Sequence, residues 1–348
     1  MANSQPGLNG KQDLEDHTPD HRFSSLSLSS QTIHADDFLN KGQDVAPPLH
    51  LSTTFRYSNN PDDLVALSEL DPHASQEGHV YSRHTAPNTT RFEAILSNIL
   101  KGPTLTYASG LSAFHALLVY LNPKRISIGE GYHGCHGVID IHKKLTGLTK
   151  IPLDCPAEDL QPGDIIHVET PLNPQGTAYN LAAFAEKAHS RGAFLSVDAT
   201  FAPPPLQDPF LWGADIVMHS GTKYIDNALK SSDAETEVVR RAVLKIEHAS
   251  LQEEDIKDGW LLKQMPNGFG PVFAIVLKEV GFAKKLPSKL ELFHHATSLG
   301  GVESLIEWRA MSDATVDQKL LRVSVGIEGW EDLRDDLLQA FRSLVDEK

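Results

Sequence analysis

The stretch Asp198–Tyr224 reads DATFAPPPLQDPFLWGADIVMHSGTKY, and its residue types indicate two neighbouring strand ends. Ala214–Met218 is an apolar run of strand length that leads toward Lys223, the one lysine of the stretch. The short strand Leu195–Val197 ends in a similar way at Asp198. The carboxyl ends of parallel strands meet at one edge of a sheet, so we expect the acid and the amine to reach the same cavity.

The residues next to the lysine favour a bound cofactor. Ser220 and Thr222 put two small hydroxyl side chains just before Lys223, where they can bind a phosphate. Pyridoxal phosphate needs an amine for its Schiff base and an acid beside its pyridine nitrogen, and Lys223 and Asp198 would supply them. The alternative is a surface lysine that follows an ordinary α/β strand.

Predicted strands and helices alternate through the middle of the chain. This alternation is typical of an α/β fold, with a parallel sheet covered by helices on both faces and a site at the carboxyl ends of the strands. The predicted strands are 104–107, 126–128, 164–169, 194–197 and 214–218, and the predicted helices include 91–96, 111–121 and 181–191.

The C-terminal part indicates a smaller α+β domain. Its predicted elements are a charged helical segment at 228–250, a strand at 270–277, a helix at 287–294, a strand at 320–326 and a closing helix at 330–344. The N-terminal residues are polar, with little to bury. We therefore expect a disordered tail at 1–31, an arm at 32–60, a large cofactor-binding domain at 61–226 and a small domain at 227–348.

The composition indicates a globular protein that acts on small molecules. The chain has 348 residues, of which 40% are apolar, and its formal net charge of -15 argues against nucleic-acid binding. Cys135 and Cys155 lack metal-ligand spacing, so we expect neither a disulfide framework nor a metal site. No apolar run approaches membrane-spanning length and the N-terminus is polar and acidic, so we expect a cytoplasmic protein with no membrane partner.

The segment Gly129–Gly134 offers an alternative cofactor site. It fits the pattern G-x-G-x-x-G after a predicted strand, and Asp154 follows at the distance typical of a nicotinamide site. Against this, bulky residues stand where pyrophosphate would approach the backbone, and no clear apolar helix follows. We favour a loop that presents the Tyr132 ring to a flat cofactor, and an ordinary loop rather than a metal site for His133 and its neighbours.

Three further features are candidates for binding anions. The small-residue turn Ser109–Gly110 precedes a predicted helix, whose N-terminus can bind a phosphate. Arg322 lies within an apolar strand, so it needs a partner, which is either a substrate carboxylate or a structural acid. Arg83 is a plausible anion ligand, and a solvated surface residue is the alternative.

Eight motifs, in order along the chain, resemble those of the pyridoxal-phosphate enzymes of Cys/Met metabolism. That family includes cystathionine γ-synthase, the cystathionine lyases and O-acetylhomoserine sulfhydrylase. The resemblance implies fold type I, with catalytic dimers commonly paired into tetramers, so we expect a homodimer or homotetramer. The motifs are YSR, SGLSA, the Tyr132 loop, ETPLNP, VDATFAPPPLQ, HSGTKY, SLGGVESL and LLRVSVGIE, and they run from about residue 32 to 344.

The resemblance also implies a role for each matching residue. Lys223 and Tyr132 would be the catalytic residues, Lys223 as the Schiff-base lysine and Tyr132 stacked on the cofactor ring. Tyr81 and Arg83 would reach the phosphate from the neighbouring subunit. The implied cofactor-binding residues are Lys223, Asp198, Thr200, Ser220, Thr222, Gly110, Leu111, Tyr132, Asn173, Tyr81 and Arg83, and the implied substrate-binding residues are Arg322, Ser298 and Glu303.

The chain departs from the family pattern at three places. Ala199 replaces the Asn usual after the Asp, and PNTT stands where NPT is common. The family continues past its lysine with a glycine-rich segment, a further strand and a long helix, whereas here Ile225–Lys230 follows at once. Several tens of residues are therefore expected to be missing after Tyr224.

The resemblance implies reactions of small amino-acid substrates. We favour a cystathionine γ-synthase-like reaction of an O-acylhomoserine with cysteine. Cystathionine γ- or β-lyase and O-acetylhomoserine sulfhydrylase activities are the alternatives, because the same residues around the cofactor serve all of them. A further alternative is an impaired, truncated chain that acts only as an associating subunit.

Overall fold

The computed structural model describes residues 26–40, 45–69, 78–221, 223 and 237–346, which form two compact units, Met1–Thr106 and Tyr107–Lys348. Residues 1–25 of the predicted tail lie outside this description. Helix α2 (Leu28–His34) begins inside the predicted tail, where the Ser27 hydroxyl caps it by accepting from the Ser30 backbone N–H.

The first unit is held together around helix α3 (Pro87–Leu100). Arg91 on this helix forms an ion pair of 2.7 Å with Asp36 and donates to the Leu39 carbonyl. The unit also contains the short helices η1 (Asp37–Leu39), η2 (Pro61–Asp63) and η3 (Leu67–Glu69). The strand predicted at 104–107 is absent from the described residues: the Thr106 backbone N–H instead donates to the Glu93 side chain.

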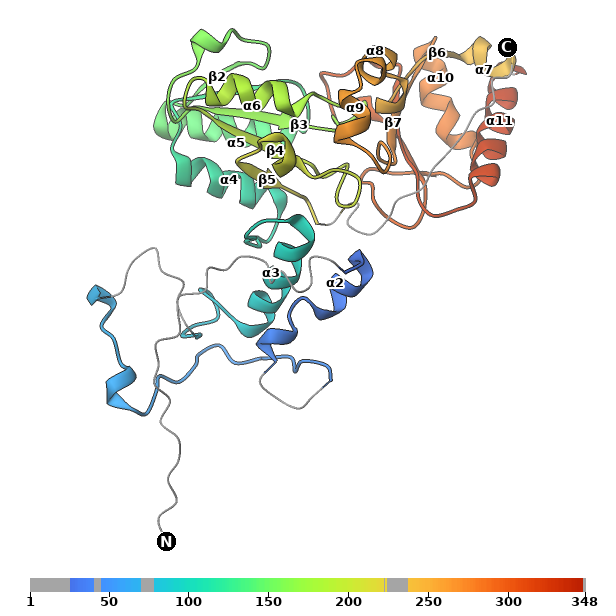
Figure 1. Ribbon diagram of the computed structural model, residues 1–348. Helices are drawn as coiled ribbons and strands as arrows, with labels where there is room; N and C mark the ends of the chain where they lie inside the picture. Colours follow the sequence, from blue (N-terminus) through green and yellow to red (C-terminus); the bar gives the residue numbers. More distant parts are fainter. Residues whose placement is uncertain (1–25, 41–44, 70–77, 222, 224–236, 347–348) are drawn as a thin grey trace. The chain divides into compact units, whose positions relative to one another are not determined.

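The second unit contains a parallel sheet, which confirms the expected α/β class (Figure 1). The strand order is β2-β1-β3-β4-β5, and every pair is parallel. The strands are β1 (Arg125–Ile128), β2 (Thr149–Pro152), β3 (Ile165–Glu169), β4 (Phe194–Asp198) and β5 (Ile216–Met218).

Helices cover both faces of this sheet (Figure 1). Ile165 packs in one apolar cluster with α4 (Gly110–Leu121) and α5 (His133–Thr146), whereas Ile166 packs in another with α6 (Leu181–His189). This split follows from the two-residue period of a strand, because neighbouring side chains point to opposite faces. The short helices η4 (Ala157–Asp159) and η5 (Pro209–Trp212) lie in connections.

A second sheet forms the C-terminal part, with strand order β6-β7-β10-β9-β8. Its strands pair antiparallel except for β8 with β9. The strands are β6 (Val243–Glu247), β7 (Val272–Leu277), β8 (His294–His295), β9 (Leu305–Trp308) and β10 (Leu320–Ser324). Helices α10 (Val280–Lys285) and α11 (Trp330–Asp346) pack with β7, β9 and β10 around one apolar core.

The remaining elements of this part are short helices. They are α7 (Glu237–Ala242), η7 (Ala249–Leu251), α8 (Glu253–Lys257), α9 (Trp260–Gln264), η8 (Leu286–Lys289) and η9 (Arg309–Met311). Among the described residues, none of the helices combines the length and the apolar character that crossing a membrane requires.

Three further predictions about local structure were wrong. The helical pattern at 228–250 gives a helix only to Ala242 in its described part, because β6 then pairs with β7. The helix predicted at 287–294 ends at Lys289, since the backbone N–H groups of residues 291–293 donate to the Asp336 carboxylate. The loop expected after Tyr132 is helix α5, which begins at His133. Tertiary contacts override local preference in the first two cases.

Candidate functional site

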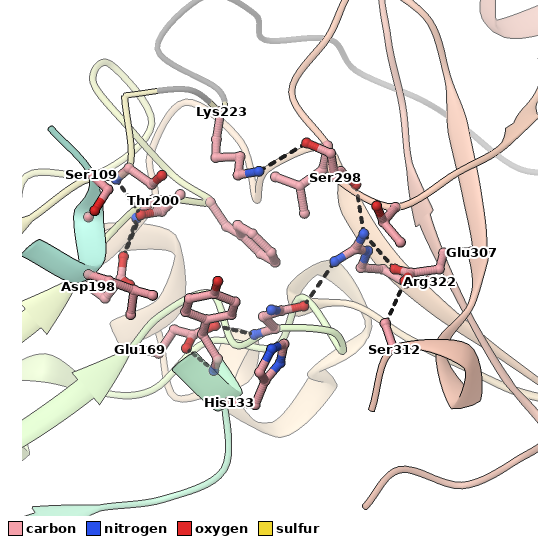
Figure 2. Close-up of a pocket in the computed structure, with 18 of the residues that line it drawn as sticks. Ser109, His133, Glu169, Asp198, Thr200, Lys223, Ser298, Glu307, Ser312 and Arg322 are labelled. Carbon is pink, nitrogen blue, oxygen red and sulfur yellow. Dashed lines mark hydrogen bonds and ion pairs between the residues drawn. The ribbon is translucent and has the colours of Figure 1, made fainter. Parts of the chain in front are cut away.

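A cavity of about 500 Å³ lies within the second unit, at the carboxyl ends of the parallel strands and beside the second sheet (Figure 2). Both sheets supply side chains to its wall. The lining residues are Ser109, Gly110, Leu111, Tyr132, His133, Glu169, Asn173, Asp198, Thr200, Phe201, Met218, Ser220, Lys223, Thr297, Ser298, Leu299, Glu307, Arg309, Ser312 and Arg322.

A buried acid stands at the end of β4. The Thr200 backbone N–H and hydroxyl both donate to Asp198 Oδ1, at 3.0 and 2.5 Å. The same hydroxyl accepts from the Ser220 backbone N–H at 2.8 Å, so it ties the chain after β4 to the chain after β5. Burial raises the pKa of the Asp198 carboxyl, and the bonds from Thr200 oppose that rise.

The start of α4 forms a cradle for an anion. Ser109 caps this helix by accepting from the Ser112 backbone N–H at 3.1 Å. A Cβ atom at Gly110 would lie 3.5 Å from the Ser220 Cβ, so the helix start and the hydroxyl residue are in contact range. Free N–H groups and the positive end of the helix dipole favour an anion at such a position.

The Glu169 carboxylate, at the end of β3, holds two loops in place. Its Oε2 accepts from the Tyr132 backbone N–H and its Oε1 from the Asn173 backbone N–H, both at 2.7 Å. Gly131 has φ of +136°, and a Cβ atom there would lie 2.5 Å from Glu169 Oε2, so this approach requires glycine. Burial, and next the Asp198 charge, raises the pKa of Glu169 to about 8.

The Lys223 amine reaches across to the second sheet's side of the cavity. Its Nζ donates to Ser298 Oγ at 3.0 Å. Burial, and next the Arg322 charge, lowers the pKa of this amine from its ordinary value. Gly300, with φ of +81°, packs against the lysine backbone so closely that a Cβ atom there would lie 2.6 Å from Lys223 Cα.

The Arg322 guanidinium, on β10, is buried against a carboxylate. Its Nη2 lies 2.7 Å from Glu307 Oε2 and donates to the Ser298 carbonyl at 2.6 Å, and its Nη1 donates to Asn173 Oδ1 at 3.5 Å (Figure 2). Ser298 therefore contacts Arg322 through its carbonyl and Lys223 through its hydroxyl. The backbone of Ser298 is left-handed, with φ of 79°.

The structure brings most of the predicted site residues to this one cavity. Those that line it are Gly110, Leu111, Tyr132, Asn173, Asp198, Thr200, Ser220, Lys223, Ser298 and Arg322. Glu303 is exposed and does not line it. Tyr81 and Arg83 belong to the first unit, where the Arg83 guanidinium lies 4.6 Å from the Tyr81 ring centroid. Thr222 lies outside the described residues.

Several lining residues had not been predicted. Glu169 and His133 stand beside predicted residues, and the end of a predicted strand was a signal for Glu169. Glu307, Arg309 and Ser312 had no comparable signal, since Glu307 lies in the strand β9, which the sequence did not predict, and the other two follow it. The glycines at 131 and 134, which suggested a nicotinamide loop, flank Tyr132 and allow the close packing around it.

Comparisons with known proteins agree with one another. The family model described as Cys/Met metabolism PLP-dependent enzyme matches residues 29–230 and 237–342. Cystathionine gamma-lyase of Saccharomyces cerevisiae is 29% identical over 401 residues, covering 91% of this chain and 98% of the relative. Cystathionine gamma-synthase of Escherichia coli is 26% identical over 377 residues, covering 86% of this chain and 93% of the relative.

A solved structure has a similar fold. The crystal structure of metB from Corynebacterium glutamicum matches with a TM-score of 0.76 and 25% identity, covering 92% of this chain and 99% of the other. The alignment with the yeast protein is 401 positions long, more than the 348 residues of this chain, so that relative carries segments that are absent here.

Proposed function

This chain belongs to the family of Cys/Met metabolism PLP-dependent enzymes, and we propose that its reaction joins an O-acylhomoserine to cysteine, giving cystathionine and a carboxylic acid. The observation that carries the proposal is the presence of Lys223 and Arg322 in one cavity, where the amine and the guanidinium are linked through Ser298. An amine that holds a cofactor and a guanidinium that holds a carboxylate are what an amino acid substrate requires.

The residues of the cavity fit pyridoxal phosphate. The Lys223 amine would bind it covalently, and the start of α4 with Ser220 would hold its phosphate, where the missing side chain of Gly110 leaves room. Asp198 Oδ1 accepts the two hydrogen bonds from Thr200, and the carboxylate would pair with a protonated ring nitrogen. Tyr132 would lie against the ring and Asn173 would bond the ring oxygen.

The side chains of this protein would bind and orient the substrate and transfer its protons. Pyridoxal phosphate, when bound, supplies an electron sink that makes the α-proton of the amino acid acidic. Arg322 would bind the α-carboxylate and so orient the substrate in the cavity. Lys223, whose pKa is lowered by burial and by Arg322, would accept and return protons at the α and β carbons.

The overall exchange at the γ carbon is balanced. The bond from Cγ to the acyl oxygen breaks, and the acyl group leaves as a carboxylate. The cysteine sulfur forms the new bond to Cγ and loses its thiol proton. No oxidant or reductant is needed.

A lyase reaction is the second candidate, because the yeast relative is named cystathionine gamma-lyase. It would break the carbon–sulfur bond of cystathionine and, with the uptake of one water molecule, release a keto acid, ammonia and a thiol. Product analysis separates the two: the chain is given O-acetylhomoserine with cysteine, and separately cystathionine. Breakdown of cystathionine without its synthesis would exclude the proposal in favour of the lyase.

We also propose that the protein is a homodimer or homotetramer. Light scattering on the purified chain tests this assembly. A chain that co-purifies with a full-length homologue, and has no turnover of its own, would instead support a role as an associating subunit.

A further inference from the structure

The His133 imidazole is a titratable group of the cavity wall that has no role in the reaction described so far. It lines the cavity at the start of α5, and its ring packs on the Tyr132 ring with 4.9 Å between the centroids. Figure 2 shows His133 across the cavity from Lys223. The residue is exposed, and among the described residues its ring has no hydrogen-bond partner. A ring nitrogen is therefore available to a substrate.

One step of the proposed reaction requires a base. The nucleophile in a reaction of cysteine is the thiolate, and only a few per cent of a free thiol is ionised at neutral pH. The new bond from sulfur to Cγ therefore forms faster if a side chain of the protein takes the thiol proton. Such a base is most efficient when its pKa lies near the working pH.

Most of the titratable side chains in the cavity wall are already engaged. Glu169 accepts from two backbone N–H groups through its two oxygens, and Glu307 contacts two guanidinium groups. Under the proposed function, Asp198 pairs with the ring nitrogen of the cofactor and Lys223 transfers protons at the α and β carbons. A guanidinium cannot accept a proton. None of these groups is left for the thiol proton.

Tyr132 and His133 are the titratable residues of this wall that remain. A phenol, with an ordinary pKa of about 10, carries its own proton at neutral pH, whereas an imidazole changes its charge between about pH 5 and 8. The charge of His133 interacts with that of Asp313, in the chain after β9, and with that of His136, in α5. A nearby carboxylate stabilises the imidazolium that would form.

We propose that His133 is a catalytic residue that accepts the thiol proton of the incoming cysteine. The proposal rests on the proposed function for the identity of the thiol. The S–H bond breaks, the proton goes to a ring nitrogen of His133, and the electron pair on sulfur forms the bond to Cγ. The imidazolium then releases its proton to solvent, which balances the loss of the acyl group as a carboxylate.

The ratio of two products separates this step from the rest of the reaction. The chain is given O-acetylhomoserine and cysteine, and cystathionine is measured against the keto acid that forms when water takes part instead of cysteine. His133→Gln should lower this ratio about tenfold at about pH 7, where little of the thiol ionises without a base. His136→Gln is the matched control and should keep the ratio, because His136 contacts Lys150 Nζ at 2.9 Å and does not line the cavity.

The pH dependence distinguishes a base from a residue that only shapes the cavity. At about pH 9 most of the thiol ionises by itself, since its ordinary pKa is about 8.5, so His133→Gln should lower the ratio by about threefold or less. A residue that only shapes the cavity would lower the ratio equally at the two pH values, and that result overturns the proposal.

A spectroscopic measurement requires neither turnover nor cofactor. L-cysteine is added to the protein without pyridoxal phosphate, and ultraviolet absorbance measures the thiolate fraction of the bound cysteine. At about pH 7 this fraction should be at least about threefold that of free cysteine, and His133→Gln should bring it down to the value of free cysteine. The absence of excess thiolate in the original chain overturns the proposal, whether or not the variant folds.

The two measurements also separate this proposal from the proposed function. A chain that gives the thiolate signal and makes keto acid without cystathionine contradicts the proposed function, while the assignment of His133 stands. A chain that makes cystathionine in the same product ratio as both variants keeps the proposed function and overturns the role of His133.

Discussion

Glu307 and Arg322 stand directly opposite each other on β9 and β10, and their side chains form a buried ion pair of 2.7 Å. The two side chains are 3% and 6% exposed, so both charges are almost completely buried. The antiparallel register places them on the same face of the sheet. This pairing fixes the guanidinium at the edge of the cavity before a substrate arrives.

Glu307→Ala is expected to destabilise the protein by about 3–5 kcal/mol, because it leaves the guanidinium groups of Arg309 and Arg322 buried without their shared carboxylate. Urea unfolding followed by circular dichroism measures the change. Glu331→Ala, on the exposed first turn of α11, is the control and should change stability by less than about 0.5 kcal/mol. If both variants changed the free energy of unfolding by a similarly small amount, the Glu307 carboxylate would not be needed to keep the two arginines buried.

Lys223→Ala is expected to abolish covalent attachment of pyridoxal phosphate. Among the described residues that line the cavity, Lys223 is the lysine that can supply the amine. The protein is incubated with the cofactor, reduced with borohydride and digested, and mass spectrometry finds the labelled peptide. Lys245→Ala, which removes an exposed lysine paired with Glu247, should keep full labelling. Labelling that persists in Lys223→Ala, at another lysine, would contradict the assignment.

The sequence predicted the meeting of Asp198 and Lys223 because it depends on local signals. Each residue follows a short apolar strand, and parallel strands end at one edge of a sheet. The register confirms this geometry, with Asp198 opposite Met218 on the neighbouring strands β4 and β5. The residues around Tyr132 had also led us to expect its ring beside a flat cofactor, and the motifs of the resemblance then gave Asn173 its role.

The pair of Glu307 and Arg322 could not be predicted in the same way. It depends on which strands pair and in which register, and β9 carries no strong local strand signal. The hydrogen bonds that Glu169 accepts could not be predicted either, because their donors are backbone N–H groups in two separate loops. Long-range contacts of this kind leave no local trace in the sequence.

The stability of the cofactor-free protein is expected to fall as the pH rises toward 8, because burial and Asp198 raise the pKa of Glu169 to about 8 from an ordinary 4.5. A carboxyl with a raised pKa keeps its proton in the folded chain at pH values where the unfolded chain has lost it. Its contribution is therefore complete at low pH and is lost as the pH rises through the folded value. The slope would be at most about 1.4 kcal/mol per pH unit for this one group.

Urea unfolding at several pH values between about 5 and 8 measures this slope, and Glu169→Gln should flatten it. Glu186→Gln, a change in α6 outside the cavity, serves as the control and should keep the slope of the original protein. A slope that is the same in all three proteins would show that Glu169 is not the titrating group.

Gly300→Ala is expected to displace the lysine that holds the cofactor. The added methyl group would lie 2.6 Å from Lys223 Cα, and the φ of +81° at this position already disfavours any side chain. We expect at least about a tenfold loss of cofactor affinity, measured by absorbance titration. Gly281→Ala, where a Cβ atom meets nothing within 4 Å, is the control. Cofactor affinity that is equal in the two variants would contradict the role of this contact.

The last prediction is that this chain turns over its substrates much more slowly than its relatives do. The alignment with the yeast protein exceeds the length of the whole chain, and the family resemblance places the missing residues after Tyr224, next to the lysine. A catalytic side chain must be held to within about half an ångström of its productive position by the structure around it. Among the described residues, the Lys223 side chain donates to Ser298 and its backbone packs against Gly300, both far beyond the join in sequence, and before the join its backbone N–H donates to the Ser220 carbonyl at 3.1 Å.

Restoring the missing segment tests this expectation. The matching segment of the yeast relative is inserted between Tyr224 and Ala228, and the original and extended chains are compared for bound cofactor per chain and for product formed. The extended chain should bind about one cofactor per chain and gain at least about tenfold in turnover, since a misplaced group commonly costs that much or more. An insertion of the same length made of Gly and Ser should give no gain, because it supplies length without structure. Full cofactor occupancy and turnover in the original chain, equal to that of the yeast protein, would show that Lys223 reaches its productive position without the missing segment.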